Sequence, residues 1–279
     1  MTEKPEDSSA LQPAEKGSGA LVRAMDRRVS IASRVLSEIA VKKAAETGIS
    51  KTSRRITLEV AMRFLEDADS VNLNEYAAID LDAAEVLAQH ADDLILDGLK
   101  ELDVEVAEAL AKHECLLSLN GLTELDTDVA AALAMHEHWL CLGGLTELDM
   151  EVAEALVKYE GGQLVLGGLT DLSVEVAEAL AKYEGGLSLS GLTELDMEVA
   201  AALAKHEGEL LLNGLTELDV EVAKALAGHE GALFLQGLTD LNVKAAEALA
   251  GKKEGRLYLL NLFLSDEAKW VLSRNENIL

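Results

Sequence analysis

The stretch GGLTELDMEVAEALVKYEGGQLVL, residues 143–166, decides the fold because nearly the same pattern recurs before and after it. The Gly of its Gly-Leu pair falls at positions 98, 121, 144, 168, 191, 214 and 237, in steps of 23 or 24 residues. Degenerate copies occupy 56–65, 71–90 and 256–272. A fixed period of this length is typical of arrays in which each unit buries its apolar side against its neighbours.

One unit, 117–137, predicts a short strand, a turn and a short helix. Leu117 and Leu119 alternate with polar residues, which gives the period of two of a strand, and Gly121 then turns the chain. Asp126 stands where a helix N-cap belongs, because its carboxylate can accept from the free N–H groups of the first turn. The matching cap residues are Asp103, Asp149, Ser173, Asp196, Asp219 and Asn242. We expect the helices to close at left-handed glycines, namely Gly161, Gly185, Gly208 and Gly231.

The helical half of the unit is apolar around most of its circumference. At 100° per residue, Val106 and Leu110 point toward the sheet and alanines flank them on both sides. Glu105, Glu108 and Lys112 are left for water. An apolar surface this wide predicts a helix that contacts the sheet and a neighbouring helix on each side.

Strand, helix and strand in one sheet predict parallel pairing with a right-handed crossover. We count about nine strands, from Val71–Leu73 to Leu257–Leu259. Helices need more lateral room than strands, about 8–10 Å against about 4.8 Å, so the helical side must fan out. The fold class is therefore an α/β solenoid over 56–279, a horseshoe with a concave parallel sheet and convex helices, preceded by an N-terminal helix.

The pattern LxLxGLTxL resembles the leucine-rich-repeat proteins, in a short bacterial form; one copy is Leu187, Leu189, Gly191, Leu192, Thr193 and Leu195. The resemblance covers about residues 56–272 and implies a partner bound on the concave strands. That family usually has an Asn ladder after the strand, where this chain has Leu99, Leu122 and Leu145. We expect threonines of the turn to satisfy its backbone instead: Thr123, Thr146, Thr170, Thr193, Thr216 and Thr239.

Charge divides the chain in two. The formal net charge is −27, yet residues 1–56 hold 11 Lys and Arg against 7 Asp and Glu, a net charge of +4, which leaves −31 for the rest. The acidic balance excludes nucleic acid as a partner of the solenoid, because phosphates would be repelled. Two cysteines make no disulfide framework, and neither a signal peptide nor a membrane span is visible, so we expect a soluble, cytoplasmic protein.

The basic part precedes the array. Residues 1–18 read as a disordered tail and 19–55 as a basic amphipathic segment, helical over 19–45. Its candidate contact residues are Arg23, Arg27, Arg28 and Arg34. Three interpretations stay open: a cap over the first turn of the array, a segment that docks on the acidic solenoid of its own or a neighbouring chain, and a helix that binds a partner or a membrane surface.

Repetition places like residues in columns. One column, near the helix C-termini, holds His90, His113, His136, Tyr159, Tyr183, His206 and His229. Metal binding is one interpretation; we favour a structural one, in which histidine stabilises the helix dipole and fills space, since tyrosine replaces it. A second column forms an acidic rim: Glu101, Glu124, Glu147, Asp171, Glu194, Glu217 and Asp240. We favour a solvated edge over a calcium site or a seat for a basic partner.

The positions that vary most lie on the concave face, beginning with Ile95 and Asp97. The predicted partner-binding residues are Ser118, Asn120, Cys141, Val165, Ser188, Ser190, Leu211, Asn213, Phe234, Gln236 and Tyr258. Leu211, Phe234 and Tyr258 form an apolar cluster. With no catalytic, cofactor or metal motif, the sequence predicts a non-enzymatic interaction or scaffold module that presents the concave strand face and the acidic rim to a protein partner, for which a basic partner is one option. The alternative is a self-assembly protein in which the basic helix binds an acidic solenoid or a surface.

Overall fold

The computed structural model describes residues 54–259 and 264–278, which lie within one compact unit spanning 51–279. The predicted tail 1–18 and nearly all of the predicted basic segment 19–55 lie outside the described residues. Arg54 and Arg55 are described, and Arg55 begins the first strand.

Strands and helices alternate along the described chain. The helices are α2 (Leu58–Glu66), α3 (Leu81–Leu87), α4 (Val104–Leu110), α5 (Thr127–Leu133), α6 (Met150–Leu156), α7 (Val174–Leu180), α8 (Met197–Leu203), α9 (Val220–Leu226), α10 (Val243–Ala250) and α11 (Asp266–Leu272). The strands are β1 (Arg55–Ile56), β2 (Ala78–Ile79), β3 (Leu94–Ile95), β4 (Leu117–Ser118), β5 (Leu140–Cys141), β6 (Gln163–Val165), β7 (Gly186–Ser188), β8 (Leu210–Leu211), β9 (Leu233–Phe234) and β10 (Leu257–Tyr258).

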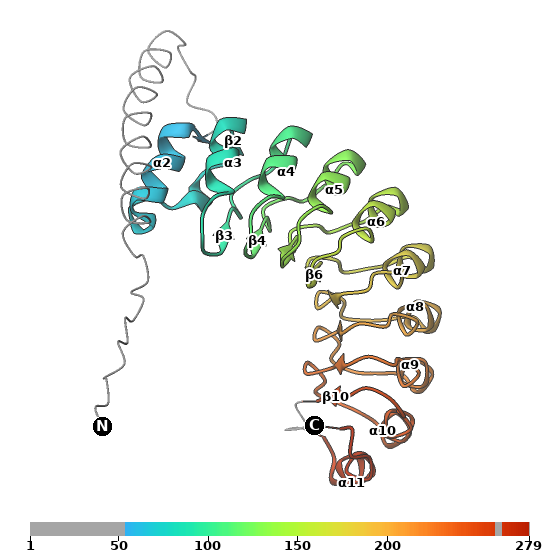
Figure 1. The fold of residues 1–279 in the computed structure, drawn as a ribbon. Helices are drawn as coiled ribbons and strands as arrows, with labels where there is room; N and C mark the ends of the chain where they lie inside the picture. The colour runs from blue at the N-terminus through green and yellow to red at the C-terminus, as the bar shows by residue number, and fades with distance from the viewer. Residues whose placement is uncertain (1–53, 260–263, 279) are drawn as a thin grey trace, which may run out of the picture. The chain divides into compact units, whose positions relative to one another are not determined.

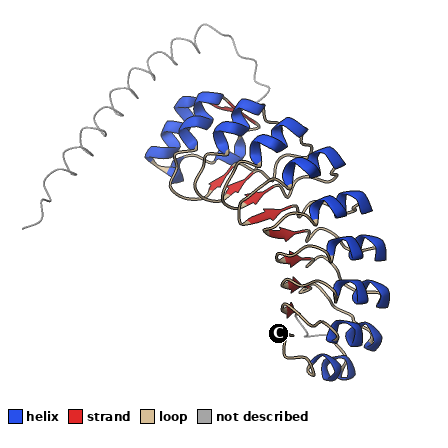
Figure 2. Cartoon of the chain, turned by 45° about the vertical axis from the view of Figure 1, so that its right-hand side comes forward, coloured by secondary structure: helices blue, strands red, loops and turns tan. Residues whose placement is uncertain are grey.

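The strands β3 to β10 form one parallel sheet in sequence order, which confirms the predicted α/β solenoid. Within this unit the strands line the inner side of the arc and the helices the outer side (Figure 1). Figure 2 shows the strands side by side, with the row of helices across from them. Each helix packs against the next, as the wide apolar surface of the unit predicted.

The first predicted strand is wrong. Val71–Leu73 is not a strand; Leu73–Glu75 forms a short 3-10 helix after Asn72, whose side chain accepts from the N–H of Asn74. That local bond competes with strand pairing. The first two units instead pair by β1 and β2, just before their helices, in a separate two-stranded parallel sheet that aligns Ile56 with Ile79. The register places these two isoleucines, 23 residues apart, at equivalent positions of the first two units.

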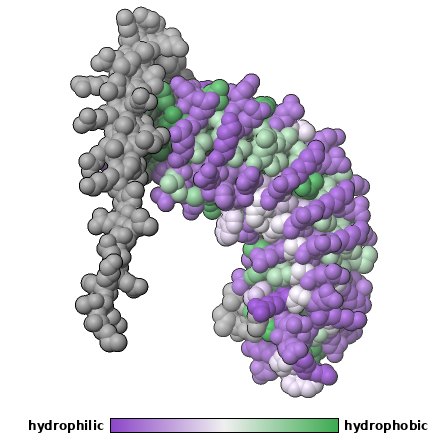
Figure 3. Space-filling model, viewed as in Figure 1, coloured by the Kyte–Doolittle hydropathy of each residue, from purple (hydrophilic) through white to green (hydrophobic). Residues whose placement is uncertain are grey.

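The core follows the predicted helix faces. Val106, Ala107 and Leu110 are buried, whereas Glu105 and Glu108 are exposed. The inward leucines of the strands are also fully buried: Leu94, Leu117, Leu140, Leu164, Leu187, Leu210, Leu233 and Leu257. Burying one such side chain contributes about 1.5–3 kcal/mol. The column of leucines therefore supplies much of the free energy that stacks successive repeat units, which we call coils. In Figure 3 hydrophilic residues cover most of the visible helical surface.

The predicted N-cap positions are confirmed, although the cap bond forms only in some units. Asp149 accepts from the N–H of Val152 at 2.8 Å, and Ser173 from the N–H of Val176 at 3.2 Å. Asp103 occupies the same extended cap position without a side-chain bond. The sequence therefore marks where the helices begin, and the structure shows which of the caps are bonded.

The predicted left-handed helix closures are wrong. Gly255 is the one described glycine with a positive φ, at 65°, so the four predicted glycines have ordinary backbone conformations. They are needed for contact between coils: a Cβ on Gly208 would collide with the carbonyl oxygen of Gly185, and one on Gly231 with that of Gly208. Steric approach of consecutive coils, rather than conformational freedom, requires glycine here.

Candidate functional site

The inner face of the sheet presents one row of side chains. Parallel pairing without slippage aligns the outward residue of each strand with that of the next: Ile95, Ser118, Cys141, Val165, Ser188, Leu211, Phe234 and Tyr258. We call these eight residues the concave row. The structure thus brings the predicted strand candidates together, although they are far apart in sequence. None of the eight is charged, in a chain with a net charge of −27.

The C-terminal end of the concave row is an apolar cluster. The rings of Phe234 and Tyr258 stack with centroids 4.3 Å apart and planes 5° apart, and Leu211 lies in register beside Phe234. All three side chains are half-buried. The C-terminal segment covers the free edge of β10, since Leu257 donates its N–H to the carbonyl of Asn277 at 2.8 Å. These three side chains are therefore partly exposed on the inner face of the sheet.

Other members of the row are less available. Ser118 and Ser188 are buried, at 3% and 6% exposure, so they offer a partner almost no surface. Ser118 Oγ also donates to Asp97 Oδ1 at 2.6 Å. Val165 remains half-buried on the row, and Ser190 half-buried beside it. Their role in partner binding stays a prediction.

Beside the row runs a polar ladder that sequence reasoning missed. Asn74 Oδ1 accepts from the N–H of Asp97, and Asp97 Oδ1 accepts from the N–H of Asn120, both at 2.9 Å. Asn120 Oδ1 accepts from the N–H of Gly143 at 2.6 Å. Near the other end Asn213 does the same for Gln236 at 3.0 Å.

Each ladder residue thus satisfies a backbone N–H one coil onward. Asn120 and Asn213 were predicted as partner contacts, and in the structure their side-chain oxygens accept this structural hydrogen bond. The signal was in the sequence, because Asn74, Asp97 and Asn120 stand 23 residues apart. Of the threonines expected to satisfy the backbone of the turn, Thr239 does so in the described chain. Its hydroxyl donates to the carbonyl of Thr216 at 3.3 Å.

Cys141 is a poor nucleophile. It is half-buried, and burial raises the pKa of its thiol, with the charges of Asp97 and Asp93 acting in the same direction. A raised pKa keeps the thiol protonated near neutral pH, and the thiolate is the reactive form. The geometry gives this cysteine no activation for catalysis.

The histidine and tyrosine column forms a continuous buried stack, which we call the ring column. Its members are His113, His136, Tyr159, Tyr183, His206 and His229, each at most 2% exposed. Successive ring centroids are 6.4, 6.5, 5.6, 6.2 and 6.1 Å apart, with planes within 19° of parallel. His90 instead packs edge-on against Phe64 at 5.1 Å.

The structure corrects half of the expectation for the ring column. The rings fill the space between coils, as predicted, but burial lowers the pKa of all four histidines, so they are neutral and do not stabilise a helix dipole as cations. Lys252 and Asn275 extend the column at the same spacing and were missed. Asn275 Nδ2 donates to the carbonyl of Lys252 at 2.7 Å.

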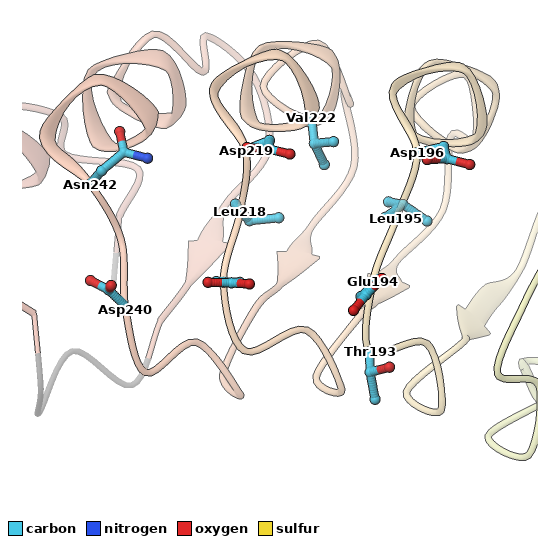
Figure 4. A pocket seen from close by; sticks show the side chains of 10 residues that line it. Thr193, Glu194, Leu195, Asp196, Leu218, Asp219, Val222, Asp240 and Asn242 are labelled. Carbon is cyan, nitrogen blue, oxygen red and sulfur yellow. The ribbon is translucent and has the colours of Figure 1, made fainter.

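The acidic rim lies on the loops between strand and helix. Glu194, Glu217 and Asp240 line one groove together with the cap residues Asp196 and Asp219 (Figure 4). None of the rim carboxylates forms a salt bridge with any described residue. Within the described ranges, no cluster of three or more His, Cys, Asp and Glu is placed to hold a metal ion.

Some sequence predictions lie beyond the described residues. Arg23, Arg27, Arg28 and Arg34 belong to this group, so their contacts stay predictions. No helix in the described part of the chain has the length and apolarity needed to cross a bilayer.

Comparison with known proteins returned structural matches alone. No protein-family model matches the sequence, and no curated protein matches it. A leucine-rich-repeat protein of Leptospira interrogans is 20% identical, with a TM-score of 0.34 over 72% of this chain and 62% of that one, less than two thirds of its length. An internalin of Listeria monocytogenes is 14% identical, with a TM-score of 0.30 over 73% and 80% of the two chains.

The assignment of this chain rests on its own repeat and geometry. One strand and one helix recur every 23 or 24 residues, and the strands pair in sequence order in a parallel sheet with its inward leucines buried. The chain is an α/β solenoid built from a strand-and-helix repeat of 23 or 24 residues, the architecture that its LxLxGLTxL pattern predicted.

Proposed function

We propose that this chain is a non-catalytic interaction module that binds another polypeptide on its concave row. The observation that carries the proposal is the apolar cluster of Leu211, Phe234 and Tyr258, held in register at the end of the uncharged concave row. Stacked aromatic side chains supply much contact area at little entropic cost, and such residues dominate binding energy in protein interfaces. An uncharged row favours a partner segment that presents apolar side chains.

The acidic rim supports a second property of the partner. Its carboxylates lie along one edge of the same coils and have no cationic partner among the described residues. Exposed like charges in a row attract basic segments and speed their encounter, and salt screens that attraction. We infer a partner whose apolar contact segment is flanked by basic residues.

Affinity capture from the native cell tests the proposal. The bait is the full chain, compared with a double variant, Phe234→Asp with Tyr258→Asp. The matched control is Met135→Asp with Met197→Asp, which adds the same charges at exposed apolar positions outside the concave row. We expect the first variant to lose the partner and the control to keep it. Capture that is equal for both variants would refute binding at the concave row.

Binding at the rim is tested separately by salt. Replacing Glu194, Glu217 and Asp240 with Gln or Asn should weaken capture at low ionic strength and reduce its dependence on salt. Capture that stays equally dependent on salt would refute a role for the rim. A bait of residues 56–279 shows whether the basic segment is needed, which the self-assembly alternative requires.

A further inference from the structure

The ring column contains two chemically different kinds of ring. Tyr183 donates its hydroxyl to the carbonyl of Gly161 at 2.7 Å, and Tyr159 donates to the carbonyl of Gln163 at 3.3 Å. The tyrosines at the centre of the column are therefore buried with their polar atoms satisfied. A ring that is buried, stacked and hydrogen-bonded stabilises the contact between coils across a wide pH range.

The histidines on either side are buried with nitrogens left unsatisfied. Nδ1 of His113 and of His136 lies 3.4 and 3.3 Å from a carbonyl oxygen of the preceding coil, and Nε2 of each has no protein partner. Neither nitrogen of His206 or of His229 has a protein partner with hydrogen-bond distance and angle, although backbone carbonyls lie near both rings. Protonation turns both ring nitrogens into donors and adds a charge, so the closed stack disfavours the imidazolium form.

The charged groups around the histidines do little to offset this penalty. His113 faces His90 and Asp93, and of these the carboxylate of Asp93 favours the cation. His136 faces His113 and His138, which both disfavour it. For His206, the backbone carbonyls of Glu209 in its own coil and of Ala181, Gly185 and Tyr183 in the preceding coil oppose the effect of burial.

At the C-terminal end of the ring column, the surroundings disfavour protonation of a histidine more strongly. His229 faces Lys252 and His206, and the Lys252 ammonium itself donates to the carbonyl of His229. The carboxylates of Glu230 and Glu254 act on Lys252. Burial, then the charge of Lys252, and then repulsion from His206 whenever that ring is protonated, lower the pKa of His229 to about 4.

We propose that the ring column makes the contacts between coils sensitive to acid. Mild acidification opens the contacts at His113–His136 and at His206–His229–Lys252, while the contact at Tyr159–Tyr183 stays closed. In a solenoid the stability is roughly a sum of terms from neighbouring units, so separate contacts can weaken independently. The histidines gain their proton when the coils part, because in the parted state water solvates the charge.

The direction and size of the effect follow from linkage. A histidine whose pKa is lower in the closed state than in the open state adds stability above the open-state value of 6.5, and this stability is lost as the pH falls toward the closed-state value. For His229, values of 6.5 and about 4 give an increase of about 20-fold in the opening equilibrium constant between pH 7 and pH 5.

Amide hydrogen exchange on the full chain at pH 7 and pH 5, corrected for the intrinsic rate, tests the proposal. The N–H groups of Leu210 and Leu212, which donate to the next strand, report on the C-terminal contact. The N–H of Leu166 reports on the tyrosine centre in the same way. We expect the first two to lose at least 20-fold in protection relative to Leu166. An equal loss at all three would overturn the proposal.

The chain itself offers the matched variant. Replacing His206 and His229 with Tyr installs the residue that the centre uses, and a glycine follows two residues later in each case, as it does after Tyr183. We expect the pH dependence at Leu210 and Leu212 to disappear. His138→Asn, which removes an exposed histidine, should leave it unchanged.

Two outcomes would contradict the proposal at this step. Either the double variant retains the acid response of the original chain, or His138→Asn abolishes it. If the double variant does not fold, the exchange comparison within the unaltered chain still decides, because it needs no substitution.

Discussion

Two adjacent glycines make the steric packing of the coils directly testable. Gly167 and Gly168 are neighbours in one turn, and neither has a positive φ. A Cβ on Gly167 would meet nothing within 4 Å. A Cβ on Gly168 would collide with the carbonyl oxygens of Gly143 and Leu145 in the preceding coil. Alanine substitutions at the two positions therefore differ in whether the new Cβ collides with the preceding coil. They differ little in the backbone conformation that each position requires.

The expected effects have opposite signs. Gly168→Ala places a methyl group against backbone atoms that cannot swing aside as a side chain can, so the coils must separate locally. Overpacking of this kind costs about 1–3 kcal/mol, and we expect the upper end because the obstacle is backbone on two sides. Gly167→Ala meets no obstacle and reduces the freedom of the unfolded chain, which should stabilise the fold by about 0.4–1 kcal/mol.

Urea unfolding followed by circular dichroism and by tryptophan fluorescence measures both variants against the original chain. Coincident transitions by the two probes establish that a single free energy of unfolding applies. We expect the midpoint to fall for Gly168→Ala and to stay or rise for Gly167→Ala. Equal destabilisation by both would refute steric contact between coils as the reason for glycine. It would point to a conformational requirement of the turn instead.

Three further predictions concern single side chains. Tyr183→Phe removes the buried bond to the carbonyl of Gly161 and should lower the free energy of unfolding by about 1–3 kcal/mol, measured by urea unfolding. Asp149→Ala removes a bonded N-cap and should cost about 1 kcal/mol, whereas Asp126→Ala, at a cap position without a side-chain bond, should cost less in the same assay. Cys141 should react with iodoacetamide at pH 8 more slowly than free cysteine, because its thiol pKa is raised; mass spectrometry of the peptide measures the rate, and equal rates would contradict the geometry.

Much of the architecture was predictable because it is local and repeated. Three local patterns predict the unit: the period of the Gly-Leu pair, the alternation of Leu117 and Leu119, and the cap position of Asp126. Because the unit is repeated, the same prediction applies along the chain. The buried face of the helix, from Val106 to Leu110, follows from the same periodicity.

The candidate site was predicted in outline and corrected in detail. Parallel pairing made Leu211, Phe234 and Tyr258 neighbours, as expected from their spacing. Asn120 looked equally free on that face, yet its side chain bonds the backbone of the next coil. The alternation of residues says which face a side chain occupies, and it does not say whether a backbone N–H one coil away needs that side chain.

The sequence by itself determined the repeating unit, the side of each element that is buried and the order of the strands. These properties depend on residues close together in the chain, where periodicity and capping chemistry act. The tertiary structure alone decided why Gly208 must be glycine, that Asp97 bonds the next coil and that His229 is neutral. Each of these depends on how closely two coils approach, a distance set by packing along the whole array and by no local sequence preference.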